Sequence, residues 1–139
     1  MDKRKLILVF WLIAMLLPFE WLTKSVPLVR RGFDLLVRTE LAHITGHLIL
    51  FGGLAALALY VFRLPLNWKS ALILALGVLV VGLGQEFLQL QIKGRAFGWP
   101  ELFDLGVDLF GAGLGWRIYQ RLLGYGRYLR IAYFILRGG

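Results

Sequence analysis

Seven polar side chains with the chemistry to bind a ligand or to move a proton stand inside or beside strongly apolar sequence. They are His43, His47, Glu86, Gln89, Arg95, Asp104 and Asp108. An ionised carboxylate in apolar surroundings costs several kcal/mol unless it is paired. Each buried acid of this chain therefore needs a partner, and imidazole and guanidinium groups can supply one.

Helical spacing places four of these residues on the faces of two predicted helices. His43 and His47 are four residues apart, and so are Asp104 and Asp108. Residues four apart lie on the same face of an α-helix. The sequence therefore predicts one helix face with two imidazoles and another with two carboxylates.

Acids, imidazoles and one arginine suit two kinds of chemistry. The first is binding of an anionic or amphiphilic headgroup, in which Arg95 clamps a phosphate or a carboxylate. The second is acid–base catalysis, in which Glu86 or Asp104 exchanges protons with His47. The cluster has no serine or cysteine nucleophile, which favours binding over catalysis.

Each polar residue also has a purely structural interpretation. We expect Glu86 to form an ion pair with Arg95 across the end of its helix, and Asp104 to cap the start of the next helix. Gln89 and Glu101 are expected at a membrane interface. The two histidines have the spacing of a metal site, but the nearby Arg95 disfavours a cation. We therefore predict no tightly bound transition metal and no cofactor.

Composition places the chain among membrane proteins. Hydrophobic residues make up 59% of its 139 residues, and the mean hydropathy is +0.73, which is well above a soluble average. The absence of cysteine excludes disulfides, thiolate nucleophiles and cysteine-ligated metals. The net charge of +8 lies mainly between and beside apolar runs, as the positive-inside rule explains. Membrane lipids, and not nucleic acid, are the predicted partners.

Four apolar runs predict an all-α, polytopic membrane helix bundle that forms a single domain over residues 1–139. The four spans cover residues 6–22, 41–62, 71–90 and 102–119. An amphipathic segment, residues 23–40, connects the first two spans on the membrane surface. A basic, aromatic segment follows the last span at the interface. Gly111 and Gly115 have the spacing that lets helices pack closely.

The lysines and arginines orient this bundle. Most of the 16 precede the first span, join the second to the third, or follow the fourth, and the positive-inside rule places such segments in the cytoplasm. Both termini are therefore predicted to be cytoplasmic. This orientation puts the polar cluster at the outer side of the membrane.

The combined pattern resembles the VanZ-like family of small bacterial membrane proteins. The resemblance is strongest over residues 43–115. It rests on His47-x-x-x-Phe51-x-Gly53, on Glu86-x-x-Gln89 with Arg95 in the following turn, and on Asp104-x-x-x-Asp108-x-x-Gly111-x-x-x-Gly115. The resemblance implies a cell-envelope protein of the bacterial cytoplasmic membrane, and the best-known relative is linked to low-level resistance to teicoplanin, a lipoglycopeptide antibiotic. Asp108 stands where the family usually has asparagine.

Three functions follow as expectations. The first is binding of a lipid-linked envelope intermediate or a lipoglycopeptide at the outer leaflet. The second is a membrane-embedded hydrolase or transferase that acts on a lipid headgroup, and the third is a structural partner of another membrane protein. The expected ligand-binding residues are His47, Glu86, Gln89, Arg95, Asp104 and Asp108.

Overall fold

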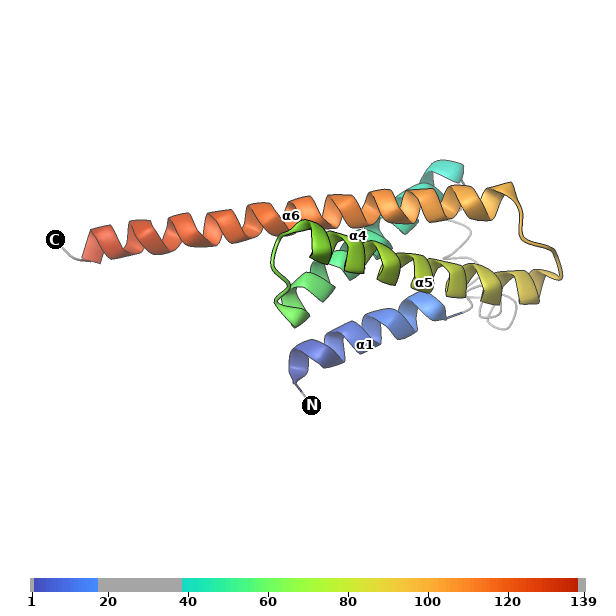
Figure 1. The fold of residues 1–139 in the computed structure, drawn as a ribbon, viewed down its shortest axis with the longest axis horizontal. Coiled ribbons are helices and arrows are strands. Elements are labelled where there is room, and N and C mark those ends of the chain that lie inside the picture. Colours follow the sequence, from blue (N-terminus) through green and yellow to red (C-terminus); the bar gives the residue numbers. More distant parts are fainter. Residues whose placement is uncertain (1, 18–38, 138–139) are drawn as a thin grey trace.

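The computed structural model describes residues 2–17 and 39–137, with side chains described up to residue 124. Its elements are α1 (Lys3–Leu16), α4 (Glu40–Phe62), α5 (Trp68–Lys93) and α6 (Trp99–Arg137), drawn in Figure 1. The predicted all-α class is confirmed. The amphipathic segment predicted at residues 23–40 lies almost entirely outside the described residues.

Polar side chains cap the starts of α4 and α5, and a residue with a left-handed backbone conformation ends each of these helices. Thr39 precedes α4, and its hydroxyl oxygen accepts a hydrogen bond from the N–H of Ala42 (3.2 Å). Asn67 precedes α5, and its side-chain oxygen accepts one from the N–H of Ser70 (3.0 Å). Both are favoured N-cap residues. Gly94 ends α5 at φ 65°, a conformation that glycine adopts without strain.

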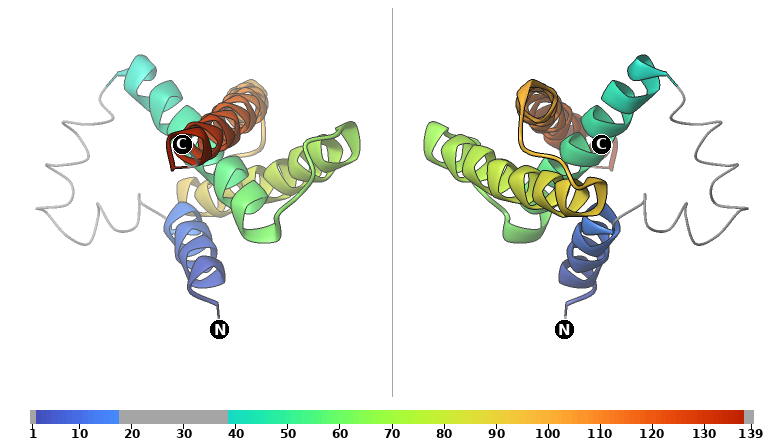
Figure 2. Two further views of the ribbon diagram at one scale, coloured as in Figure 1. Left: turned by 90° about the vertical axis from the view of Figure 1, so that its left-hand side faces the viewer. Right: turned by 90° about the vertical axis from the view of Figure 1, so that its right-hand side faces the viewer.

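Consecutive helices from α4 to α6 run in opposite directions. The start of α4, the end of α5 and the start of α6 therefore lie at one end of the bundle (Figure 1). α4 and α6 run parallel and share the most extensive interface of the described helices. Figure 2 shows α1 and α6 on opposite sides of the α4–α5 pair.

Three glycines let the backbones of α4 and α6 touch. A Cβ atom on Gly52 would lie 3.0 Å from the carbonyl oxygen of Gly111, and one on Gly111 would lie 2.9 Å from that of Leu48. A Cβ atom on Gly115 would meet the carbonyl oxygen of Gly52. Gly111 and Gly115, the glycines with the predicted packing spacing, thus both face α4.

The helix α1 packs onto α4 through a tryptophan. The indole Nε1 of Trp11 donates a hydrogen bond to the carbonyl oxygen of Leu50 (3.0 Å). Its ring lies over Gly53, where a Cβ atom would be only 2.5 Å away. A core around Phe51, which is fully buried, joins α1, α4, α5 and α6. The polar end of the bundle is built on this apolar support.

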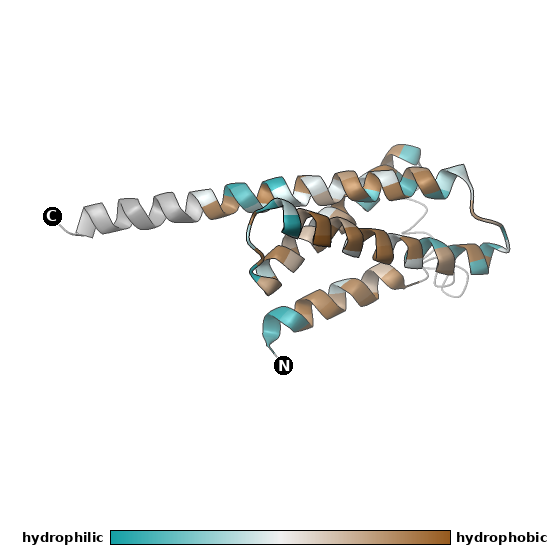
Figure 3. Cartoon of the chain, in the orientation of Figure 1, coloured by the Kyte–Doolittle hydropathy of each residue, from teal (hydrophilic) through white to brown (hydrophobic). Residues whose placement is uncertain are grey.

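α4 and α5 are long and apolar enough to cross a membrane. Only 28% of the most apolar stretch of α4, and 22% of that of α5, is buried inside the protein. The core helix of a soluble protein would be mostly buried, whereas many large apolar side chains of these two helices are exposed. Figure 3 shows α5 coloured mainly as hydrophobic. Two of the predicted spans therefore have helices that fit a bilayer.

The other two predicted spans differ from the helices observed. α1 has 14 residues, fewer than the about 20 that a perpendicular span requires. α6 does not end near residue 119, as the sequence suggested. It continues as one helix to Arg137 over 39 residues, or about 58 Å at 1.5 Å per residue. The separate interfacial segment predicted after residue 119 is thus part of α6.

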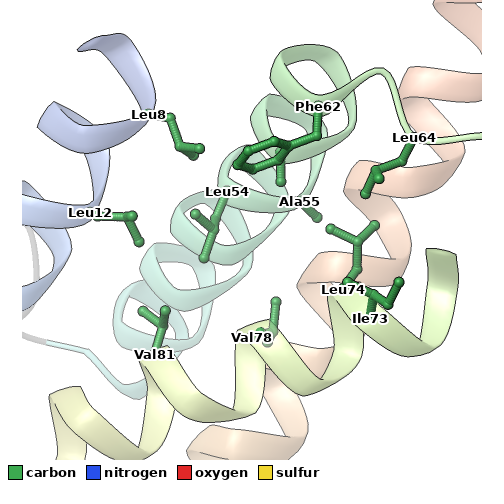
Figure 4. A pocket seen from close by; sticks show the side chains of 12 residues that line it. Leu8, Leu12, Leu54, Ala55, Phe62, Leu64, Ile73, Leu74, Val78 and Val81 are labelled. Carbon is green, nitrogen blue, oxygen red and sulfur yellow. The ribbon is translucent and has the colours of Figure 1, made fainter. Parts of the chain in front are cut away.

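An apolar cavity of about 240 Å³ lies between α1, α4 and α5, seen in Figure 4. Leu8, Leu54 and Leu74 are among its lining residues, and none of the six residues predicted to bind a ligand lines it. Its walls extend to Phe62 and Leu64, at the end of the bundle away from the polar residues.

Candidate functional site

The most buried polar contact of the described chain joins α4 to α6. Nδ1 of His47 lies 2.7 Å from Oδ1 of Asp108, and the two side chains are 6% and 1% exposed. An ionised carboxylate only accepts hydrogen bonds, so Nδ1 donates to it. Nε2 of His47 is then the nitrogen left to bind a ligand or to accept a proton.

A second histidine–aspartate pair lies one helical turn nearer the end of the bundle. Nε2 of His43 is 3.2 Å from both carboxylate oxygens of Asp104. This pair is more open, because the histidine side chain is 40% exposed and the aspartate side chain 15%. The rings of His43 and His47 are tilted toward each other, with centroids 4.5 Å apart. The two pairs therefore form one continuous polar cluster.

α5 closes this cluster from a third side. Glu86 is 4% exposed, and its charge interacts with those of Asp104 and His47. One turn earlier, a Cβ atom on Gly82 would lie 2.8 Å from Oδ2 of Asp108. Glycine at this position lets α5 approach the aspartate closely. We call His43, His47, Glu86, Asp104 and Asp108 the polar site.

Two buried oxygens, one of them in the polar site, have no hydrogen-bond partner in the part of the chain that the structure describes. They are Oδ2 of Asp108 and Oε1 of Gln85. A buried acceptor without a partner costs free energy, so such groups call for an explanation such as a bound water, ion or ligand.

Arg95 does not pair with Glu86, so this prediction is wrong. Its Nη2 donates to Oε1 of Glu101 at 2.6 Å. Glu101 is 2% exposed and also accepts the N–H of Gly98 (2.8 Å). This second bond satisfies a free amide at the start of α6, as in a capping box. Glu101 is thus a buried capping residue.

The positions of two further residues differ in part from expectation. Asp104 was expected to cap α6, but α6 begins at Trp99, and Asp104 therefore lies in its second turn, against His43. Gln89 is half-buried on α5 and accepts a hydrogen bond from Nζ of Lys93 (3.1 Å). It lies outside the polar site as defined here.

His43 and Gln85 were not among the predicted ligand-binding residues. A signal for His43 was present, because its spacing to His47 equals that of Asp104 to Asp108. Two parallel helices with equal spacing can pair at both positions. Gln85 had no comparable signal, since a single glutamine in an apolar run has no partner at a defined distance.

Three side chains of the polar site are arranged as metal ligands. One nitrogen or oxygen each from His43, His47 and Asp104 lie within 4.8 Å of one another. The same groups suit acid–base chemistry, since Asp108 orients His47 as a carboxylate orients a catalytic base. As hydrogen-bond acceptors, the carboxylates also suit ligands that carry hydroxyl or amino groups.

Comparison with known proteins gives no relative. The chain matches no family model, and no curated protein or solved structure is significantly similar to it. Inferences about function depend on the polar site and on the apolar helices that surround it.

Proposed function

We propose that this chain is a multi-pass protein of the bacterial cytoplasmic membrane, with a VanZ-like domain whose polar site binds the headgroup of a lipid-linked envelope intermediate or of a lipoglycopeptide. The observation that carries the proposal is the convergence of the polar site from three helices at one end of an apolar bundle. Polar groups inside a membrane bundle are costly and usually functional. The apolar outer faces of α4 and α5 suit the lipid tail.

Hydrogen-bond acceptors, and not an arginine clamp, carry the proposed recognition. Arg95 is engaged by Glu101, whereas Glu86, Asp104 and Asp108 bring three carboxylates together. Carboxylates accept hydrogen bonds from the hydroxyl and amino groups of sugar or peptide headgroups. The structure therefore favours a glycosylated or amine-bearing headgroup over a simple phosphate.

The proposed orientation places the polar site toward the outer leaflet. Lys3, Arg4 and Lys5 begin α1, and Arg63 and Lys69 flank the α4–α5 connection, at the end of the bundle away from the polar site (Figure 1). The positive-inside rule assigns that end to the cytoplasm.

Reporter fusions test this orientation. A reporter fused after Pro65 or after Arg137 is expected to be active in the cytoplasm, and one fused after Gly94 is expected to be active outside. A cytoplasmic signal from the Gly94 fusion, together with outside signals from the other two, would invert the bundle and contradict an outward-facing site.

Binding itself is tested on the full chain extracted with its lipids and examined by native mass spectrometry. Teicoplanin and a lipid-linked disaccharide are the two probes, and we expect one of them to bind at one per chain. The double variant Glu86→Gln/Asp104→Asn should weaken that binding at least roughly tenfold. Each substitution keeps an acceptor oxygen but turns a hydrogen bond to a charged group into a neutral one, a loss of about 1 kcal/mol or more. The two losses together exceed the about 1.4 kcal/mol that corresponds to tenfold in affinity.

Asp2→Asn is the matched control for this experiment. Asp2 caps α1, far from the polar site, and asparagine caps equally well. The control should bind like the native chain. The proposal would be contradicted if the double variant bound the probe as strongly as the native chain does. It would also be contradicted if neither probe bound to the native chain.

A hydrolase or transferase acting on a lipid headgroup is the second candidate, and the His47–Asp108 pair favours it. A buried imidazole fixed by a carboxylate at 2.7 Å has the geometry of a general base with its orienting group. Water would then be the nucleophile for hydrolysis. A shortened lipid in the same mass spectra, absent with His47→Gln, would move this candidate to first place.

A further inference from the structure

We propose that His43, His47 and Asp104 bind a divalent transition metal ion, with Zn²⁺ as the expected ion. This inference reverses the expectation drawn from the sequence. The metal site shares His47 and Asp104 with the proposed headgroup site, but it does not require that a headgroup binds. It stands on the arrangement of the ligand atoms, on the role of Asp108 and on the charge of the polar site.

The ligand atoms are already close to the spacing that a metal requires. Zinc bonds to histidine nitrogen and carboxylate oxygen at about 2.0–2.1 Å, so ligand atoms around a tetrahedral ion are about 3.3 Å apart. Nε2 of His43 lies 3.2 Å from both oxygens of Asp104. The third ligand, from His47, completes a set within 4.8 Å.

Asp108 has the position of an outer-shell carboxylate. Metal-binding histidines usually donate their other ring N–H to a carboxylate or a carbonyl, which fixes the tautomer and the ring orientation. Asp108 accepts the Nδ1 hydrogen of His47 at 2.7 Å and is 1% exposed. It therefore directs the lone pair of Nε2 away from itself and makes that nitrogen available as a ligand.

The charge of the polar site favours a dication. Asp104 is close enough to interact electrostatically with Glu86 and with Asp108, and both of these carboxylates are buried. Nearby like charges in an apolar bundle are unfavourable, and a bound cation offsets them. Arg95 no longer opposes this, because Glu101 binds its guanidinium at 2.6 Å.

The donor set selects the class of ion. Two imidazole nitrogens and one carboxylate oxygen suit Zn²⁺ and its neighbours, whereas Ca²⁺ and Mg²⁺ prefer oxygen ligands alone. Three protein ligands also leave a fourth position for water, as in catalytic and not in closed structural zinc sites.

The experiment uses the full chain in detergent, purified through a tag without histidine and stripped with a chelator. Zn²⁺ is then returned, and bound metal is measured after dialysis by elemental analysis. We expect about one Zn²⁺ per chain and a higher unfolding temperature that excess chelator reverses, because a ligand that binds the native state stabilises it. Ca²⁺ and Mg²⁺ should do neither.

Variants assign the ligands. His47→Ala and Asp104→Asn should abolish stoichiometric binding, and Asp108→Asn should weaken it by about 10–100-fold, as outer-shell changes do. Asp2→Asn is again the matched control, since it makes the same change from acid to amide at the cap of α1, outside the ligand set. It should bind Zn²⁺ like the native chain.

Several results would overturn the proposal. The native protein would retain no Zn²⁺ and would show no Zn²⁺-dependent shift in unfolding temperature. Alternatively, Ca²⁺ would stabilise it equally, or Asp104→Asn would bind Zn²⁺ like the native chain. The temperature shift of the native protein decides the matter even where a histidine variant does not fold. If one of these results is obtained and the chelated protein still binds the headgroup, the metal proposal fails and the proposed function stands.

Discussion

Gly115→Ala is expected to destabilise the protein by about 3 kcal/mol, the upper part of the range for overpacked sites. The added Cβ would meet the carbonyl oxygen of Gly52, a backbone atom that cannot rotate away. The helices α4 and α6 would have to separate, which would also disturb the pairs between them. Chemical or thermal unfolding in detergent measures the loss.

Gly113→Ala is the matched control on the same helix. A Cβ atom on Gly113 has no neighbour within 4 Å, and alanine is a better helix former than glycine by up to about 1 kcal/mol. This variant should be as stable as the native chain or slightly more stable. Equal effects of the two substitutions would show that close contact between α4 and α6 does not hold the fold together.

Asp108→Leu is expected to cost about 3–5 kcal/mol, the range for removing one partner of a buried pair. The change leaves the Nδ1–H of His47 buried without an acceptor. Asp108→Asn keeps an acceptor oxygen in the same shape, so it should cost less than about 1.5 kcal/mol. Unfolding of the two variants in parallel separates the loss of the hydrogen bond from the loss of the charge.

A double substitution tests whether the loss of stability in Asp108→Leu comes from leaving His47 without its partner. His47→Leu/Asp108→Leu removes both polar groups, and replacing both partners by apolar groups is often close to neutral. The double variant should therefore be more stable than Asp108→Leu alone. Additive losses would mean that the two side chains act independently, contrary to their 2.7 Å contact.

The sequence predicted the central helices well because their signals are long. The run at residues 41–62 matches α4 to within one residue, and α5 extends three residues beyond each end of the run at residues 71–90. The ends of α1 and α6 were harder. The basic, aromatic sequence after residue 119 predicted a segment that follows the last helix, but arginine is a good helix former, and α6 continues to Arg137.

Pairing of charges was less predictable than the helices. Arg95 had two acidic neighbours, and the sequence favoured Glu86 because that acid is surrounded by apolar residues. Glu101 instead receives the arginine, because it is held nearby by its bond to the N–H of Gly98. A local capping contact of this kind depends on where the helix begins, and helix boundaries are the feature that is hardest to predict from a sequence.

The parallel run of α4 and α6 has a consequence for how the two helices are aligned. His43 faces Asp104 and His47 faces Asp108, and both pairs are 61 residues apart in the chain. Glycines that recur every few residues tolerate several alignments, because a smooth surface fits after sliding by one turn. A one-turn slip would leave one histidine and one aspartate each without its partner.

The two histidine–aspartate pairs of the polar site therefore fix the register of α4 against α6. Buried polar groups are known to fix the alignment of helix pairs at some cost in stability. Here the histidines and aspartates of the polar site also favour a single alignment of α4 against α6. A substitution that damages the site should therefore release the alignment as well, and one that shifts the alignment should dismantle the site.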